Sequence, residues 1–315
     1  MQSVNPNPKD RAVSQPPRIG WHVLPVIVFS QFCGTSLWFA SNGIMSPLTA
    51  HFGLPPTALG DLTASVQFGF ITGTLVFAVL TLADRFPPTR VFFWSAALGT
   101  LANLGLIWEG NSYATLLLLR FATGFFLAGI YPVGMKIASD YYDKGLGTSL
   151  GYLVGALVLG TAFPHLLGSG FLSISWKQVV GITSAMAFLG GLSMWFLPDG
   201  PFRNRMQKLD LAAFFSVFRN REFRAPAFGY FGHMWELYAF WAFVPLMLGT
   251  YSDLHQESHL SPPLWSFLII GIGGPACVLG GYLSRSFGAR KVAATSLVLS
   301  GSCCLILPWA LLSLF

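Results

Sequence analysis

The sequence predicts an all-α protein that crosses a membrane several times, and three observations support this fold class. Of the 315 residues, 53% are hydrophobic and only 10% are charged, whereas soluble domains carry about 25% charged residues. Nine apolar runs each have about the 20 residues that a helix needs to cross a bilayer. The basic residues gather in every second loop between these runs, as expected of a chain that crosses back and forth.

The polar segment at residues 1–20 precedes the first apolar run. Its prolines and charged side chains predict a disordered tail; they are Pro6, Pro8, Lys9, Asp10, Arg11, Pro16, Pro17 and Arg18. The run that follows is too long for the apolar part of a secretory signal, and no small-residue cleavage site ends it. The segment is therefore not expected to be a secretory signal.

Each of the nine apolar runs is predicted to be a transmembrane helix, because only a helix satisfies its own backbone where there is no water. They lie at residues 22–46, 61–83, 90–108, 113–138, 147–168, 178–197, 224–249, 263–283 and 291–315. All but two of the 18 Lys and Arg residues, Arg120 and Lys177, lie in the tail or at the loops after the second, fourth, sixth and eighth runs. This bias predicts a multi-pass protein of the cell (inner) membrane with a cytoplasmic N-terminus.

The longest predicted cytoplasmic loop is at residues 199–222. Basic residues outnumber acidic ones in it, and its apolar residues predict a short amphipathic helix on the membrane surface. These apolar residues are Leu209, Leu211, Phe214, Phe215 and Phe218.

A short charged loop occurs twice, at corresponding positions. One copy, Leu82 to Arg90, follows the second apolar run, and the other, Leu283 to Lys291, follows the eighth. The copies align at a leucine, at a phenylalanine (Phe86 with Phe287) and at the last basic residue. A repeat of about two hundred residues, carried by hydropathy as well as identity, is typical of transporters built from two related halves.

The two loops resemble the signature that joins helices 2 and 3, and again helices 8 and 9, in the major facilitator superfamily, Gly-x-Leu-x-Asp-Arg-x-Gly-Arg-Arg. The first copy departs from it at Leu80 and Pro87, and the second at Arg285, which replaces the acid. The positions that match are Leu82, Asp84, Arg85 and Arg90 in the first copy, and Gly281, Leu283, Gly288, Arg290 and Lys291 in the second.

This resemblance implies a helix bundle of the superfamily type with two halves. We expect a disordered cytoplasmic tail at 1–20, a six-helix N-terminal half at 21–198, a cytoplasmic linker at 199–222 and a C-terminal half at 223–315. The C-terminal half would hold only three helices. We therefore expect either that the chain is incomplete or that a partner supplies the remaining helices, and we favour the first.

The resemblance also implies a role for the two loops in gating. Asp84, Arg85 and Arg90 are expected to form a cytoplasmic charge latch that pairs across the two halves and holds the outward-facing state of the transporter. The basic residues of the second loop, Arg285, Arg290 and Lys291, are expected to act in the same gate.

Arg120 is a candidate for the substrate or proton pathway, because a charge inside a membrane is costly and marks function by default. It lies about a third of the way into the run 113–138. Arg120 and Gly124 match the R-x-x-x-G motif of the superfamily's fourth helix, which implies proton coupling or the holding of an anionic substrate. The alternative is that Arg120 extends toward the outer headgroups.

Glu236 and His233 form a second candidate in the seventh run. They lie three residues apart and project from one helical face. A carboxylate and an imidazole can exchange a proton, so this pair predicts proton handling or substrate binding. The alternative is a structural pair that is hydrogen-bonded to a neighbouring helix.

The first run carries a polar stripe at helical spacing that consists of Gln31, Thr35, Trp38 and Asn42. A helix that faces lipid would not display this stripe, so we expect it to face the interior of the bundle. It either lines a substrate cavity or bonds to adjacent helices, and the sequence favours neither.

We interpret the chain as a secondary active transporter that moves a small solute by alternating access, with a proton-coupled symporter as the preferred form. An uncoupled facilitator, or a truncated superfamily chain without independent activity, is the alternative. No HExxH, paired intramembrane Asp, CxxC or P-loop pattern occurs, so the sequence predicts no enzyme, no metal site and no cofactor. The expected partners are the substrate, protons and the lipid bilayer, without nucleic acid.

Overall fold

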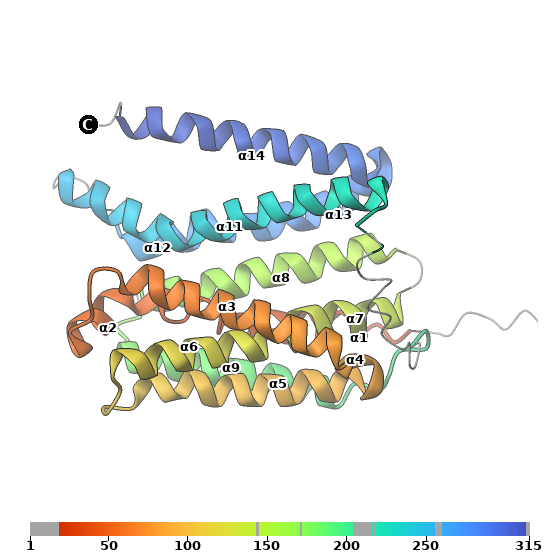
Figure 1. Ribbon diagram of the computed structural model, residues 1–315, viewed down its shortest axis with the longest axis horizontal. Coiled ribbons are helices and arrows are strands. Elements are labelled where there is room, and N and C mark those ends of the chain that lie inside the picture. Colours follow the sequence, from red (N-terminus) through yellow and green to blue (C-terminus); the bar gives the residue numbers. More distant parts are fainter. Residues whose placement is uncertain are drawn as a thin grey trace, which may run out of the picture.

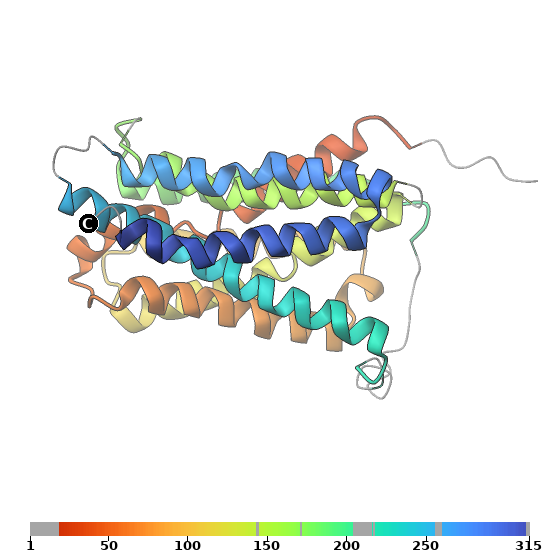
Figure 2. The same cartoon turned by 90° about the horizontal axis from the view of Figure 1, so that it is seen from above.

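The computed structural model describes residues 19–142, 145–170, 172–203, 216, 218–255 and 260–312, and within these ranges it is a helix bundle without strands (Figures 1 and 2). Most of the predicted tail and of the predicted amphipathic linker helix lies outside these residues. Both remain predictions.

The helices follow one another up and down the bundle. The N-terminal elements are α1 (Val23–Thr35), η2 (Asn42–Ile44), α2 (Met45–Phe52), α3 (Ala58–Val79), α4 (Leu82–Arg85), α5 (Pro88–Leu104), η3 (Gly105–Ile107), α6 (Tyr113–Leu127), α7 (Tyr131–Tyr141), α8 (Leu146–Leu167) and α9 (Trp176–Trp195). The C-terminal elements are α11 (Arg221–Leu254), α12 (Pro262–Gly271), α13 (Gly273–Phe287) and α14 (Ala289–Leu312).

Helical segments lie at all nine predicted runs, and the predicted all-α membrane fold is confirmed. Seven described helices are long and apolar enough to cross a membrane. These are Ala58–Val79, Pro88–Ile107, Tyr113–Tyr141, Leu146–Leu167, Trp176–Trp195, Pro262–Phe287 and Ala289–Leu307. Neither α1, which is short, nor α11 is among them, so the count of nine spans is not confirmed.

The first predicted run is not one continuous helix. α1 ends at Thr35, residues 36–41 form turns, and a 3-10 turn (η2) leads into α2. We call residues 36–41 the α1–η2 turn. Side-chain hydroxyl groups compete here with backbone N–H groups for the carbonyl oxygens of the helix. Thr35 Oγ1 donates to the Gln31 carbonyl at 2.8 Å, and Ser36 Oγ donates to the Cys33 carbonyl at 2.7 Å. The sequence-based prediction of a helix over 22–46 missed this interruption.

Two helices begin at serines that form capping boxes. Ser112 Oγ accepts from the Thr115 N–H at 3.3 Å, and Thr115 Oγ1 accepts from the Ser112 N–H at 2.8 Å, which starts α6. Ser175 and Gln178 make the same exchange at 3.3 and 2.7 Å and start α9. Because such bonds satisfy N–H groups that the first turn leaves free, they set where each helix begins and, for α6, the depth of Arg120.

Helix α8 is where the N-terminal and C-terminal helices meet. Within the N-terminal part, α3 packs on α6, α5 packs on α6 and α9, and α1 packs on α8 and α9. Both α12 and α13 run along α8, α11 contacts α12 and α3, and α14 packs on α13 at the outer edge (Figure 1). One hydrophobic core joins the two parts, since it includes Trp38, Leu157, Trp241 and Ile270.

Glycines allow α8 and α13 to approach closely. A Cβ added to Gly151 would lie 3.0 Å from the Cys277 carbonyl oxygen and 3.2 Å from the Gly281 Cα. A Cβ added to Gly155 would lie 2.8 Å from the Gly274 carbonyl oxygen. This contact, which we call the α8–α13 glycine seam, is the small-residue packing that membrane helices use instead of hydrophobic collapse.

Candidate functional site

The guanidinium of Arg120 is fully buried and points at the α1–η2 turn. Its Nη1 donates to the Leu37 carbonyl at 3.1 Å, and its Nη2 donates to the Trp38 carbonyl. The interruption of the first helix leaves backbone carbonyls that a continuous helix would use, and Arg120 satisfies two of them. The side chain is therefore directed into the bundle and not toward the headgroups.

A polar network extends from Arg120 to α5 and α9. Arg120 Nη1 also donates to Asn103 Oδ1 at 3.4 Å. The amide nitrogen of Asn103 donates to Thr183 Oγ1 at 3.3 Å and to Ser184 Oγ at 3.0 Å. Sequence reasoning missed Asn103. The signal that could have found it is one amide at a position that is otherwise apolar in the run 90–108.

The positive charge of Arg120 has no negative partner among the described residues, where all the ion pairs involve other side chains. All three of its partners are neutral oxygens, and its Nε has no hydrogen-bond partner in the described part of the chain. A buried charge without a counter-charge is costly. This arrangement is suited to receive an anion.

The polar stripe of the first run faces the bundle interior, as its spacing indicates. Gln31 is fully buried against Gly134 of α7, and neither of its amide atoms has a partner in the described residues. Asn42 donates from Nδ2 to Thr63 Oγ1 at 2.9 Å, which ties η2 to α3. Of the two uses that the sequence left open, Asn42 serves helix contacts, whereas Gln31 retains unused hydrogen-bonding groups.

Trp38 lies in the α1–η2 turn and is fully buried. Its indole stacks on Tyr238 of α11, with ring centroids 5.3 Å apart and planes at 22°, and it also packs on Phe70 of α3 at 4.6 Å. The neighbouring Phe39 meets Trp241 edge-on at 6.3 Å. These rings join the first helix to α11, and sequence reasoning did not identify the residues on α3 and α11.

Glu236 is a residue of α11, and its side chain contacts α14. Ser300 Oγ and Cys304 Sγ donate to its Oε1 at 2.7 and 3.0 Å. His233 Nδ1 lies 3.4 Å from Oε2, so the expected proximity of the two candidate groups is present. The side chain of Glu236 is 26% exposed and that of His233 is 36% exposed, so neither is sealed in the bundle.

The first charged loop has its partners within the N-terminal helices. Asp84 Oδ1 lies 2.9 Å from Lys136 Nζ of α7, and Lys136 also lies 3.7 Å from Asp140. Arg90 places its guanidinium 3.3 Å above the ring of Trp195 in α9. The expected pairing across the two halves is therefore not seen among the described residues.

The other basic residues that were predicted for the gate are exposed. These are Arg85, Arg285, Arg290 and Lys291. Arg285 lies beside Gly145 at the start of α8, where a Cβ on the glycine would come within 2.7 Å of Nη2. The second loop thus approaches the end of the helix that carries the glycine seam.

The opposite end of the bundle carries an ion cluster around Glu109, in the loop before α6. Lys177 of α9 donates to Glu109 Oε1, and His51 Nε2 of α2 lies 2.8 Å from Oε2. Both hydrogen bonds hold the pKa of Glu109 below its ordinary value, and the bond from Lys177 has the larger effect. The cluster joins α2, α9 and the loop that precedes the helix of Arg120.

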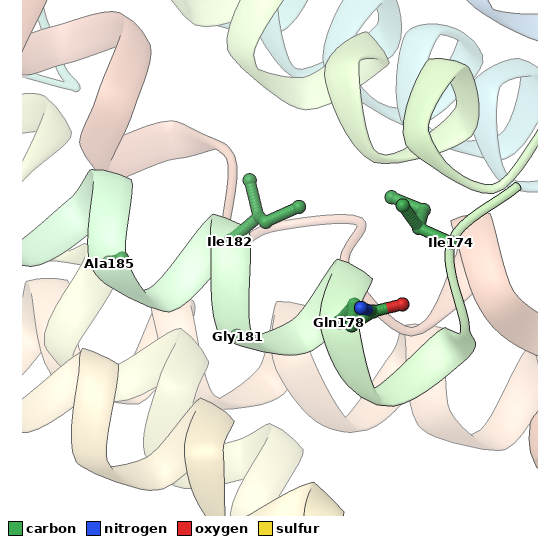
Figure 3. A pocket seen from close by; sticks show the side chains of 5 residues that line it. All are labelled: Ile174, Gln178, Gly181, Ile182 and Ala185. Carbon is green, nitrogen blue, oxygen red and sulfur yellow. The ribbon is translucent and has the colours of Figure 1, made fainter. Parts of the chain in front are cut away.

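Two shallow grooves lie away from the buried candidates. One, of about 410 Å³, lies on α9, where Ile174 and Ile182 face each other above Gln178 (Figure 3). The other, of about 260 Å³, lies at the end of α7 beside Tyr141 and Asp199. Neither is lined by a residue predicted for the substrate pathway.

Comparison with known families and structures gives one consistent result. The family model described as Major Facilitator Superfamily matches residues 27–315. A solved relative, a bacterial homolog of the human lysosomal transporter Spinster in an inward-facing and unoccupied conformation, superposes with a TM-score of 0.60 at 20% identity. The match covers 85% of this chain and 63% of that chain, and it supports the fold.

Curated relatives are described as transporters. The chain is 25% identical over 232 residues to the "Probable L-galactonate transporter" of Escherichia coli (strain K12), covering 66% of this chain and 49% of the relative. It is 26% identical over 301 residues to the "Probable nitrate/nitrite antiporter NarK1" of Thermus thermophilus, covering 87% and 62%. The chain therefore spans less than two thirds of the length of either relative.

Proposed function

Because the chain belongs to the major facilitator superfamily, a family of membrane transporters and not of enzymes, we propose that it moves a small anion across the membrane by alternating access. The family membership that the two charged loops indicated is thereby confirmed. Transport activity, the anion and the driving force are parts of the proposal. The location in the cell membrane and the orientation with the N-terminus in the cytoplasm are also parts of the proposal.

The observation that carries the proposal is the buried charge of Arg120. Its guanidinium is fully buried and binds neutral oxygens of Leu37, Trp38 and Asn103. An anion that approached Arg120 would supply the missing counter-charge in a medium where Coulomb attraction is strong. A cation at the same place would be repelled.

The names of the relatives point in the same direction. The relatives described above are named for L-galactonate and for nitrate and nitrite, all of which carry a negative charge. These names support an anionic class and do not distinguish an organic from an inorganic substrate. The chain's own residues must provide that distinction.

Alternating access requires that the N-terminal and C-terminal helices move relative to each other. In this structure they meet at the α8–α13 glycine seam and at the rings around Trp38. Arg120 holds the backbone of Trp38, so the proposed anion site and the contact between the two parts are linked through one residue.

Reconstituted vesicles provide the test. The purified chain should take up labelled nitrate or L-galactonate faster than empty vesicles, and should not take up galactose or choline. Arg120→Gln, which keeps hydrogen-bond donors and removes the charge, should abolish anion uptake. Uptake of a neutral solute or a cation in preference to both anions would overturn the proposed class.

We also propose that Glu236, with His233, couples transport to protons. Both groups are partly exposed and close enough to exchange a proton, and the other groups that face Glu236 are Ser300 and Cys304 of α14. Glu236→Gln keeps the size and the hydrogen bonding but removes titration. We expect it to abolish anion accumulation that is driven by external acid while sparing exchange of anion between the two sides.

An uncoupled facilitator is the second candidate, and one observation favours it. Two α14 side chains already occupy one oxygen of Glu236, which is the arrangement expected of a structural carboxylate. If Glu236→Gln still concentrates the anion when acid is applied outside, the role of Glu236 is structural. If wild-type uptake is indifferent to the pH gradient, the facilitator is correct.

A further inference from the structure

The stacked rings of Trp38 and Tyr238 lie at the point where α11 closes on the N-terminal helices. Only three residues of α11 are buried along its 34 residues, namely Trp241, Ala242 and Val244. They lie within two turns after Tyr238, and Trp241 among them meets Phe39 of the α1–η2 turn. The close contact of α11 with the N-terminal helices is therefore made largely of aromatic faces.

Polar groups near these rings are left without partners. Trp38 Nε1, Gln67 Nε2 and both amide atoms of Gln31 are buried and have no hydrogen-bond partner among the described residues. Gln67 lies one turn before Phe70, the ring that packs on Trp38. A buried donor without a partner is costly. A ligand that formed hydrogen bonds with these groups would therefore be stabilised by bonds that the closed structure does not make.

Two further tyrosines lie near Tyr238. Tyr238 lies within electrostatic range of Tyr131 of α7 and of Tyr230, two turns earlier on α11. Tyr131 and Tyr238 pack against the same hydrophobic core as Trp38. The stack is thus bordered by tyrosine side chains from both parts of the molecule.

An aromatic face, amide and hydroxyl groups, and one uncompensated positive charge define the chemistry of a ligand. The apolar C–H face of a carbon skeleton packs on an indole, hydroxyl groups bond to amides and phenols, and a carboxylate neutralises an arginine. Nitrate offers the charge but has no carbon face and no hydroxyl groups. Resting on the proposed anion transport, we propose that Trp38 and Tyr238 form the specificity-determining platform of the site, and that its substrate is a polyhydroxylated organic carboxylate.

The platform is closed in this structure, because Trp38 is fully buried beneath the ring of Tyr238. The substrate replaces one ring of the stack with its own carbon face, and this requires α11 to separate from the α1–η2 turn. Binding and the separation of the two parts are then the same event. Selectivity between carboxylates of this class and small inorganic anions resides in Trp38.

The ratio of L-galactonate uptake to nitrate uptake in proteoliposomes tests this assignment, since a ratio is insensitive to the amount of folded protein. We expect the wild type to prefer L-galactonate. Trp38→Leu removes the platform and should lower the ratio about three- to tenfold, the range expected for one aromatic contact. Trp38→Phe keeps a ring without the N–H and should lie between the two, whereas Tyr238→Phe keeps the stack and should retain the preference.

Trp235→Leu is the matched control, because this tryptophan lies on α11, the helix of Tyr238, and is 81% exposed. Its ratio should equal that of the wild type. An unchanged ratio in both Trp38 variants, or a wild type that moves nitrate in preference to L-galactonate, would overturn the platform while leaving anion transport intact. Failure of the wild type to move either anion would overturn both proposals.

Discussion

Arg120 and Glu236, the two charges that the sequence predicts to lie inside the membrane, are held in opposite ways. Arg120, in the N-terminal helices, is fully buried and donates to two backbone carbonyls and an amide oxygen. Glu236, in the C-terminal helices, is 26% exposed and accepts from two side chains of the outermost helix. The first charge organises a core, and the second fastens a peripheral helix.

The same contrast extends to whole helices. Among the seven helices that could span a membrane, α8 has 67% of its most apolar part buried, whereas the last one has none. The N-terminal helices pack on one another through several pairs, but α14 packs chiefly on α13. The N-terminal part therefore carries its own packing. The C-terminal helices are attached to it chiefly by the packing of α12 and α13 on α8 and by the aromatic stack, and Glu236 fastens α14 to α11.

The largest expected effect comes from removing Arg120. Arg120→Leu leaves the Leu37 and Trp38 carbonyls and the Asn103 amide oxygen without their donor. At about 1 kcal/mol for each hydrogen bond between membrane helices, the loss of stability is about 3 kcal/mol. Thermal unfolding of the purified protein in detergent measures it.

The control for this variant is Arg85→Gln, at an exposed arginine that is the last residue of α4. It should change the free energy of unfolding by less than about 0.5 kcal/mol. The desolvation of the buried charge opposes the three hydrogen bonds. If Arg120→Leu is as stable as the wild type, the desolvation cost offsets these hydrogen bonds in full, and Arg120 is retained for function alone.

The dependence of the C-terminal helices on α8 is tested at the glycine seam. In Gly155→Ala the new Cβ lies 2.8 Å from the Gly274 carbonyl oxygen, so one backbone must shift. We expect a cost of about 1–3 kcal/mol. Hydrogen exchange should increase in α12 and α13 and remain unchanged in α5 and α9.

Gly280→Ala is the matched control for the seam, because nothing lies within 4 Å of its Cβ position in α13. Alanine stabilises a helix by about 0.5–1 kcal/mol relative to glycine, so this variant should be neutral or slightly stabilised. Equal behaviour of the two variants would show that the seam is not a tight contact.

The sequence predicts the helices far better than their contacts. Composition and run length establish an all-α membrane protein, and the repeated loop indicates the family. The interruption at residues 36–41 escaped prediction because its residues, such as Leu37 and Phe39, are as apolar as those of a helix. What breaks the helix is competition from the Ser36 hydroxyl together with a distant arginine that satisfies the freed carbonyls.

The candidate site shows the same limit. Arg120, Gln31 and Trp38 could be selected because polar or charged groups are rare in apolar runs. Asn103 could not be assigned as the partner of Arg120, nor Tyr238 as that of Trp38. The same holds for Lys136 as the partner of Asp84, since each pairing depends on which helix faces meet. The periodicity of a single helix shows which face of that helix a residue occupies. It does not show which residue of another helix it contacts.

A smaller effect on stability, with a clearer effect on function, is expected at the first charged loop. The pair of Asp84 and Lys136 is partly exposed, at 35% and 25%, so Asp84→Asn should cost no more than about 0.5 kcal/mol. We nevertheless expect slower anion uptake with normal membrane insertion, because α4 loses its attachment to α7. The double variant Asp84→Lys, Lys136→Asp should restore part of the uptake rate. An unchanged initial uptake rate in Asp84→Asn would show that the loop has no role in gating.

The smallest effect is expected at the Glu109 cluster, which joins three elements of the N-terminal part at an exposed surface. Donation from Lys177 and then from His51 lowers the pKa of Glu109, so the ionised carboxylate is the form that folding favours. Its contribution is therefore complete above the ordinary pKa of about 4.3 and is lost as the pH falls through the lower value of the folded protein. Glu109→Gln should lower the Tm by no more than about 1–2 °C between pH 5 and pH 7, with less effect at high salt, as for an exposed ion pair. The difference between the wild type and the variant should shrink as the pH falls below about 4.3 and disappear below the lowered pKa of Glu109 in the folded protein. A difference that persists or grows in acid would show that Glu109 acts through packing and not through its charge.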